Sequence, residues 1–283
     1  MPTSTIVAAP PETLIKRRVS YTRAFIGLMR RDFRVLRREI GPFLVRVAMN
    51  PLLFLFIFTY VMPHMSGGNA LNPTAQMAGG FGTVLLPGLM AVAIMFSGIA
   101  AVALPLSQEF GVTREIDDRV MTPLPIEAVA IEKIIFSALQ SIVAACAVFP
   151  MAYYIPSPHV QAHVTSWPFL IAVMVLSSLL AGALGLTIGT AVNPKQIGLI
   201  FGVVVMPITF LGCVYYPWAG LGPIPWLKYG VMVNPIVYMS EGMRAALTPL
   251  AHMPEPLILS MLSFFLVLLT WLGIRGFRRR VIS

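Results

Sequence analysis

The side chains of this chain best suited to binding or chemistry gather in one polar segment, residues 107–133. Acidic and basic residues alternate there around one short helical turn, which ends at Pro123 and Pro125. Such a mixed-charge helix suits docking into a groove of another protein, since opposite charges fix partner and register. A solvated loop whose charges merely keep it wet is the alternative. The candidate residues are Glu109, Arg114, Glu115, Asp117, Asp118, Arg119 and Thr122.

The sequence holds no motif for bond-making chemistry. It contains no GxxxxGK[ST] phosphate loop, no HExxH, no CxxC and no GxSxG. Cys146 and Cys213 lie inside apolar runs, and the four histidines are scattered. We therefore expect no catalytic residue, no metal and no cofactor bound by this chain.

A second polar pair occurs in residues 216–256, a segment too apolar for an exposed loop and too rich in proline for a span. Its Trp and Tyr residues are typical of headgroup depth. We expect a pair of short helices dipping into the outer leaflet, the second over 236–247. Glu241 and Arg244 lie three residues apart on it and can pair. A structural ion pair and a direct substrate contact are both open.

Long apolar runs must position these polar segments. The chain is 57% hydrophobic and 11% charged, which cannot cover a water-soluble globule. A spanning helix needs about 20 apolar residues. The sequence therefore predicts an all-α polytopic membrane protein with six transmembrane helices. The spans are 43–62, 84–106, 134–155, 168–192, 197–215 and 257–274.

Positive charge orients these spans. Eighteen of the 20 Lys and Arg residues fall on one side of the predicted membrane, and Lys228 and Arg244 fall on the other. Basic residues favour the cytoplasmic side. We therefore expect a multi-pass protein of the cell (cytoplasmic) membrane with both termini in the cytoplasm. Anionic lipid explains the net charge of +9 better than nucleic acid does.

Residues 21–42 predict an amphipathic interfacial helix, because apolar residues recur at three- or four-residue spacing between arginines. This helix is either an anchor for the first span or a lever that moves with a cytoplasmic motor. Its candidate residues are Arg31, Arg34, Arg37 and Arg38. The predicted domains are a cytoplasmic N-terminus (1–42), a six-span domain (43–274) and a basic cytoplasmic tail (275–283).

Small residues mark the fourth and fifth spans, which four residues join into an expected tight hairpin. Ala181, Gly185 and Gly189 recur every four residues, and Gly198 and Gly202 open the fifth span. Small residues at this spacing let helix backbones approach closely. Pro207 is expected to kink the fifth span or to end its regular part.

The order of these motifs resembles the permease subunits of type-2 ABC exporters, the ABC-2 type family, over nearly the whole chain. The run Glu109-x-Gly111-x-x-Arg114-Glu115, followed by Thr122-Pro123-Leu124-Pro125, is similar to that family's first cytoplasmic loop. The family's late signature is similar to Met206-Pro207, Pro225-Trp226, Asn234-Pro235 and Glu241-Gly242-Met243-Arg244. Its opening is similar to Arg31-Asp32-Phe33-Arg34 and Asn50-Pro51-Leu52. Asp117-Asp118 departs from the pattern, since many relatives place apolar or basic residues there.

The resemblance implies a half-transporter. Two permease copies, a homodimer or close paralogues, would share one pathway, lined by the first and fifth spans. An ABC ATPase dimer beneath would hold the ATP and Mg. The helix around Glu115–Arg119 would be the coupling helix. The re-entrant pair in 216–247 would close the pathway on the outer side. The implied outer-gate residues are Pro207, Trp226, Asn234, Glu241 and Arg244.

The expected function is ATP-driven export of a hydrophobic or amphiphilic substrate, a drug or a lipid, because Phe, Met, Leu and Val dominate the expected walls. Export of a polysaccharide or lipid-linked glycan is the alternative. A secondary transporter fits less well, since Arg46 is the one formal charge within the six predicted spans and such proteins keep an acid or base near mid-membrane. A lipid-modifying membrane enzyme lacks paired carboxylates or a metal cluster.

Overall fold

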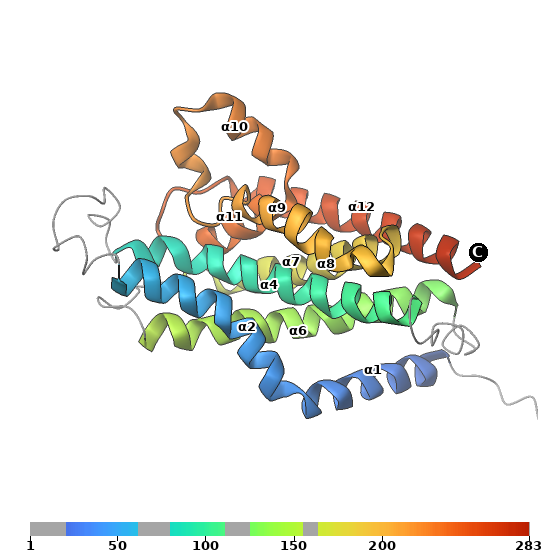
Figure 1. The fold of residues 1–283 in the computed structure, drawn as a ribbon. Helices are drawn as coiled ribbons and strands as arrows, with labels where there is room; N and C mark the ends of the chain where they lie inside the picture. Colours follow the sequence, from blue (N-terminus) through green and yellow to red (C-terminus); the bar gives the residue numbers. More distant parts are fainter. Residues whose placement is uncertain (1–20, 62–79, 111–124, 155–163, 283) are drawn as a thin grey trace, which may run out of the picture.

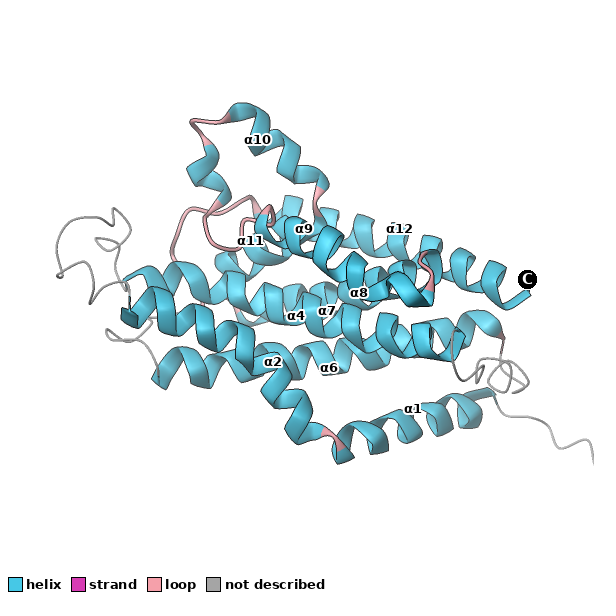
Figure 2. Ribbon diagram, in the orientation of Figure 1, coloured by secondary structure: helices cyan, strands magenta, loops and turns pink. Residues whose placement is uncertain are grey.

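The computed structural model describes residues 21–61, 80–110, 125–154 and 164–282, which form a bundle of helices with no strand among them (Figures 1 and 2). The longer helices are α1 (Tyr21–Arg38), α2 (Ile40–Leu55), α4 (Gly80–Gln108), α6 (Ile126–Tyr154), α7 (Trp167–Ala191), α11 (Pro235–Leu247) and α12 (Glu255–Ile282). The shorter ones are η1 (Phe56–Val61), η3 (Pro194–Gln196), α8 (Ile197–Ile200), η4 (Phe201–Val205), α9 (Met206–Phe210), η5 (Trp218–Leu221), α10 (Pro225–Gly230) and η6 (Val231–Val233).

The all-helical membrane fold is confirmed. Within the described residues, five helices are long and apolar enough to cross a membrane: Ile40–Phe58, Gly82–Gln108, Ile126–Tyr154, Trp167–Ala191 and Glu255–Arg280. They overlap the first four predicted spans and the last. The predicted fifth span, 197–215, corresponds to a shorter apolar run, Pro194–Phe210. The count of six spans is therefore not confirmed.

Three helix ends differ from the predicted ones, two of them because the predicted spans stop at charged residues. The third spanning helix, α6, begins at Ile126 rather than at residue 134, so it includes Glu132 and Lys133, both buried. The last helix, α12, continues through the basic tail to Ile282. The amphipathic helix ends at Arg38 rather than at residue 42, and α2 begins after a break at Glu39.

The short run α8–η4–α9 is irregular where the sequence predicted a kink. A π-helical segment, η4, comes directly before Pro207 in α9. Proline has no N–H to donate and its ring clashes with the carbonyl four residues earlier, so the preceding turn widens. Helix α2 also contains a proline, Pro51, but there the π-helix η1 follows the proline, so the missing N–H of Pro51 does not account for it.

Helix α4 is the centre of the bundle, packed against α7, α6, α11 and α2 (Figure 1). Of its apolar spanning window 72% is buried, against 12% for α2 and 17% for α12. The outer surfaces of α2 and α12 therefore face lipid or a partner.

The predicted small-residue stripe of α7 packs on α4. A Cβ added to Gly185 would lie 2.9 Å from Ile99 Cα, and one added to Gly98 would lie 2.5 Å from Ala181 Cβ. These contacts leave no room for a side chain, so the glycines set the α4–α7 distance. A Cβ at Gly198 or Gly202 meets nothing within 4 Å. The glycines of α8 and η4 therefore make no comparable contact with the described residues.

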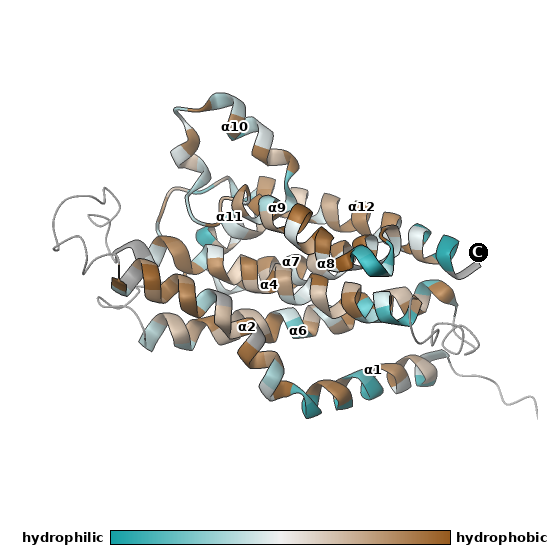
Figure 3. Cartoon of the chain, viewed as in Figure 1, coloured by the Kyte–Doolittle hydropathy of each residue, from teal (hydrophilic) through white to brown (hydrophobic). Residues whose placement is uncertain are grey.

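The two ends of the bundle differ in polarity. One end carries α1, the last turn of α4, the first turn of α6 and the C-terminus of α12, and hydrophilic residues concentrate there (Figures 1 and 3). We call it the inner end, after the predicted orientation. The opposite, outer end carries α10 and α11.

Candidate functional site

The predicted coupling segment is described only at its base. Arg114, Glu115, Asp117, Asp118, Arg119 and Thr122 lie outside the described residues. Glu109 follows the last turn of α4, where its Oε1 accepts a hydrogen bond and ion pair from Lys133 Nζ of α6 at 3.0 Å. Both side chains are about 6% exposed. This pair ties together the two helices between which the segment 111–124 runs.

A second contact at the inner end involves the C-terminal helix. Arg280 Nη1 of α12 donates hydrogen bonds to the carbonyls of Gly189, Thr190 and Val192, at 3.2, 3.1 and 2.7 Å. These carbonyls belong to the last turn of α7, where helical partners are missing and a cation is favoured. The guanidinium also lies 4.9 Å from the centroid of the Phe110 ring. Arg280 therefore joins α12 to the end of α7 and to the residue after Glu109.

The four predicted interfacial arginines, Arg31, Arg34, Arg37 and Arg38, are all exposed on α1. No residue of α1 is fully buried, and the helix contacts α6 and α2. This arrangement agrees with a helix at the membrane surface. The break at Glu39 separates it from the spanning helix α2.

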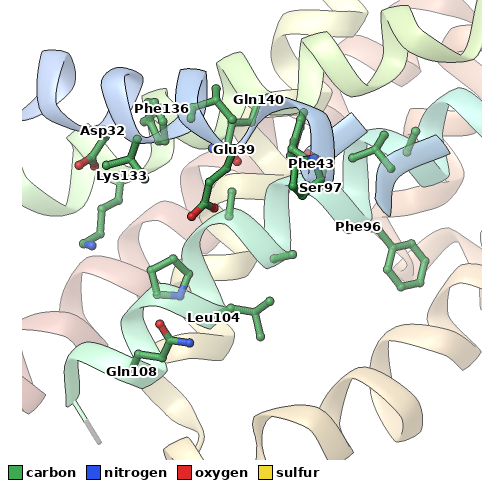
Figure 4. A pocket seen from close by; sticks show the side chains of 18 of the residues that line it. Asp32, Glu39, Phe43, Phe96, Ser97, Leu104, Gln108, Lys133, Phe136 and Gln140 are labelled. Atoms are coloured by element: carbon green, nitrogen blue, oxygen red, sulfur yellow. The ribbon is translucent and has the colours of Figure 1, made fainter. Parts of the chain in front are cut away.

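A cavity of about 900 Å³ lies between α1 and α2 on one side and α4 and α6 on the other (Figure 4). Phe201 of η4 also lines it. Its walls are mostly apolar, with Phe43, Phe96, Leu104 and Phe136 among them. Polar side chains line it as well: Arg31, Asp32, Glu39, Ser97, Gln108, Glu109, Lys133 and Gln140. The cavity is thus amphiphilic.

The predicted Glu241–Arg244 pair of α11 exists and is fully buried, with both side chains 0% exposed. Glu241 Oε1 also accepts a hydrogen bond from the backbone N–H of Trp218 at 3.0 Å, and its Oε2 accepts one from that of Met253 at 3.1 Å. Arg244 Nη2 donates to the Cys213 carbonyl at 3.1 Å. We call Glu241, Arg244 and these three backbone partners the outer clasp. It favours the structural interpretation of the pair.

Cys213 adopts φ 52°, the one positive φ outside glycine among the described residues. A side chain in this region costs about 1–2 kcal/mol. The bend it makes aims the carbonyl at Arg244, so the outer clasp holds a strained turn in place. Cys213 is a free, buried thiol.

The other predicted outer residues take different positions. Asn234 caps α11, since its Oδ1 accepts a hydrogen bond from Ile236 N at 3.0 Å, and its Nδ2 donates to the Ile208 carbonyl at 2.6 Å. It thereby joins α11 to α9, next to Pro207. Trp226, in contrast, lies on α10 with 76% of its surface exposed. Asn234 therefore joins α11 to α9, Glu241 and Arg244 join α11 to the backbone at Cys213, Trp218 and Met253, and Trp226 is exposed.

Sequence reasoning missed the cavity and its polar residues, because they come from helices far apart in the chain. No local pattern marks Glu39 or Ser97, and Asp32 belongs only to the family-like run Arg31-Asp32-Phe33-Arg34. Lys133 contributes to the charge asymmetry in the sequence, but no local pattern predicts that it is buried with Glu109 or that α6 begins at Ile126. Asn234 before Pro235 is the usual start of a helix, a cap followed by proline, so its capping role was readable. Within the described residues no group of His, Cys, Asp or Glu could hold a metal ion.

Comparison with known proteins shows the family of this chain. Residues 23–248 match the family described as ABC-2 type transporter. The chain is 25% identical over 239 residues to the inner membrane transport permease YadH of Escherichia coli strain K12, which covers 81% of this chain and 88% of that protein. Proteins of the same name from Escherichia coli O157:H7 and Shigella flexneri match to the same extent. This chain therefore belongs to the ABC-2 type transporter family and is a membrane permease of an ABC transporter, a transport component whose ATPase activity resides in a separate subunit.

Proposed function

We propose that this chain is the membrane half of an ATP-driven exporter that moves a hydrophobic or amphiphilic substrate, a drug or a lipid, out across the cytoplasmic membrane. Family membership supports the transport role, and the name of the Escherichia coli relative supports an inner-membrane location. The cavity between α2 and α4 supports a hydrophobic or amphiphilic substrate, because apolar side chains dominate its walls.

A second permease copy, identical or a close paralogue, would complete the pathway. Large apolar side chains are exposed on two helices beside the cavity, α2 and the α8–α9 run. They are Leu44, Val45, Met49, Leu52, Leu53, Phe56, Ile57, Leu199, Val203, Met206 and Phe210. The π-helical turns and open glycines in these helices favour local rearrangement. We expect the partner copy to pack against them.

The ATPase dimer would dock at the inner end, where both termini would lie in the cytoplasm. ATP and Mg would bind that partner, and this chain would hold neither. Closure of the dimer would displace the segment around Asp117 and Asp118. Because Glu109 and Lys133 join α4 to α6 at the base of this segment, the displacement would reach both helices at once. The ATPase can act on the permease only through contacts that differ between its two states.

The test is purification of the tagged chain in mild detergent from its own host, with mass spectrometry of what accompanies it. An ABC ATPase is expected. The variant Asp117→Lys/Asp118→Lys should insert in the membrane but lose the ATPase and the export activity. The matched control is Glu255→Lys, an exposed acid at the outer end, which should keep both. Equal ATPase recovery and export in the double variant and the control would contradict the coupling role.

A further inference from the structure

The cavity has the size and depth of a ligand site rather than of a packing defect. Its volume of about 900 Å³ falls within the range of sites for drug-sized ligands. The lining on α4 runs from Val92 to Glu109, which at 1.5 Å per residue is about 25 Å. A hydrocarbon core is about 30 Å thick. A molecule in the cavity would therefore reach from the inner surface deep into the membrane.

The charged part of the lining is acidic on balance. It holds three carboxylates, Asp32, Glu39 and Glu109, and two cations, Arg31 and Lys133. Glu109 is neutralised by Lys133. Within the described residues, no ion pair or hydrogen bond is recorded for the carboxylates of Asp32 and Glu39. Glu39 lies at the break between α1 and α2 and points into the cavity (Figure 4).

A buried hydroxyl on the opposite wall is an independent sign of a ligand. Several described hydroxyls of the spans donate to a carbonyl of their own helix, as Ser141 does to Ser137 and Thr190 to Leu186. The hydroxyls of Ser97, Ser177 and Ser178 are buried without a partner among the described residues, and of these three Ser97 alone lines the cavity. Ser97 is 7% exposed, and its Oγ has no hydrogen-bond partner among the described residues. A buried polar group left without a partner costs about 1–3 kcal/mol. Ser97 lines the cavity (Figure 4).

Aromatic rings surround the space between these polar groups. Phe43 of α2, Phe96 of α4 and Phe136 of α6 line it from three helices (Figure 4). Aromatic rings bury large apolar area and attract cations over their faces. The lining therefore combines acids at the inner mouth, apolar rings behind them and a hydroxyl deeper along α4.

From this arrangement we propose that the cavity binds an amphiphile with a cationic amine head, which lies against Asp32 and Glu39 while its apolar body packs on the phenylalanines and a polar atom meets Ser97. The inference rests on the proposed function and narrows its substrate class. Two sources share this chemistry: a cationic amphiphilic drug, and an aminophospholipid of the inner leaflet. The arginines on the remaining surface of α1 would face lipid phosphate outside the cavity.

The experiment uses the full chain in lipid nanodiscs, with and without its co-purified ATPase. Binding of the cationic dye rhodamine 6G is measured by fluorescence anisotropy, beside neutral Nile red and anionic anilinonaphthalene sulfonate. The variants are Asp32→Asn/Glu39→Gln, Ser97→Ala and the matched control Glu255→Gln. Competition with phosphatidylethanolamine or phosphatidylglycerol, each labelled on its acyl chain, separates a lipid source from a drug source.

The double variant should weaken rhodamine 6G binding by about tenfold, which is about 1.4 kcal/mol, and leave Nile red unchanged. Ser97→Ala should weaken binding by about threefold, and Glu255→Gln should change nothing. Displacement of the dye by phosphatidylethanolamine but not by phosphatidylglycerol would assign a lipid head; displacement by neither would assign a drug. Equal rhodamine 6G binding by the native chain and the double variant, or tighter binding of the anionic dye by the native chain, overturns the inference. Dye binding and dye displacement are both independent of ATPase recovery. Failure to recover the ATPase would instead overturn the proposed function.

Discussion

The outer clasp gives the sharpest prediction about stability, because it is a fully buried ion pair with known partners. Removing one member of such a pair leaves the other charge buried and typically costs about 3–5 kcal/mol. In Arg244→Met, Glu241 keeps the N–H groups of Trp218 and Met253 as donors. We therefore expect the free energy of unfolding to fall by the lower limit of this range, about 3 kcal/mol.

Glu241→Gln should lower the free energy of unfolding by more than Arg244→Met does. The amide has one oxygen acceptor in place of two carboxylate oxygens, so one of the two backbone N–H groups loses its partner. Arg244 would then be a buried cation facing the Cys213 carbonyl. Adding about 1–3 kcal/mol for the orphaned N–H to the cost of the broken pair gives about 5 kcal/mol.

The double variant Glu241→Gln/Arg244→Met removes both charges. It should therefore lower the free energy of unfolding by less than the sum of the two single variants. Only the orphaned backbone groups remain, at about 3 kcal/mol. The two singles sum to about 8 kcal/mol, so the coupling between the sites is about 5 kcal/mol. At about 2–4 °C per kcal/mol for a chain of this size, the midpoints should fall by about 10 °C for Arg244→Met and for the double variant, and by about 15 °C for Glu241→Gln.

The assay is thermal unfolding of the purified chain in one detergent, followed by tryptophan fluorescence. Lys228→Met is the matched control, because Lys228 lies over the Trp218 ring at 4.3 Å at the same end and contributes about 0.5–1 kcal/mol. Additive losses in the double variant, or single variants that unfold within 2 °C or so of the native chain, would refute the reasoning.

Two further predictions concern packing and the inner end. Gly185→Ala should lower the unfolding midpoint, because its Cβ would lie 2.9 Å from Ile99 backbone and overpacking costs about 1–3 kcal/mol; Gly202→Ala, where a Cβ meets nothing within 4 Å, should leave the midpoint unchanged or raise it slightly. Arg280→Gln should lower the free energy of unfolding by about 1–2 kcal/mol, because three carbonyls at the C-terminal end of α7 lose a charged donor. Arg278→Gln, at an exposed neighbouring position, should leave the free energy of unfolding unchanged. Equal effects of the two variants would contradict the capping role of Arg280.

Local patterns predicted the features that depend on neighbouring residues. Apolar run length located five of the six predicted spans, the three-residue spacing predicted the Glu241–Arg244 pair, and Pro207 predicted the break in the fifth run. The failures came from distant partners. The predicted third span begins only after Lys133, at residue 134, because a lone lysine is costly in a membrane. In the structure Glu109, which follows another helix, removes that cost.

The packing of α4 indicates which parts of the bundle can move. Gly185 and Gly98 leave no space between α4 and α7, and close-packed helices shift as rigid bodies rather than deform. At the inner end α4 is joined to α6 through Glu109 and Lys133. In contrast, α2 is little buried and is followed by the π-helix η1, and the α8–α9 run contains the π-helix η4. A push at the inner end should therefore move α4, α6 and α7 together against α2, and the cavity lies between these two parts. Its volume, and with it the contact of Glu39 with a bound head group, should change with each cycle of the ATPase.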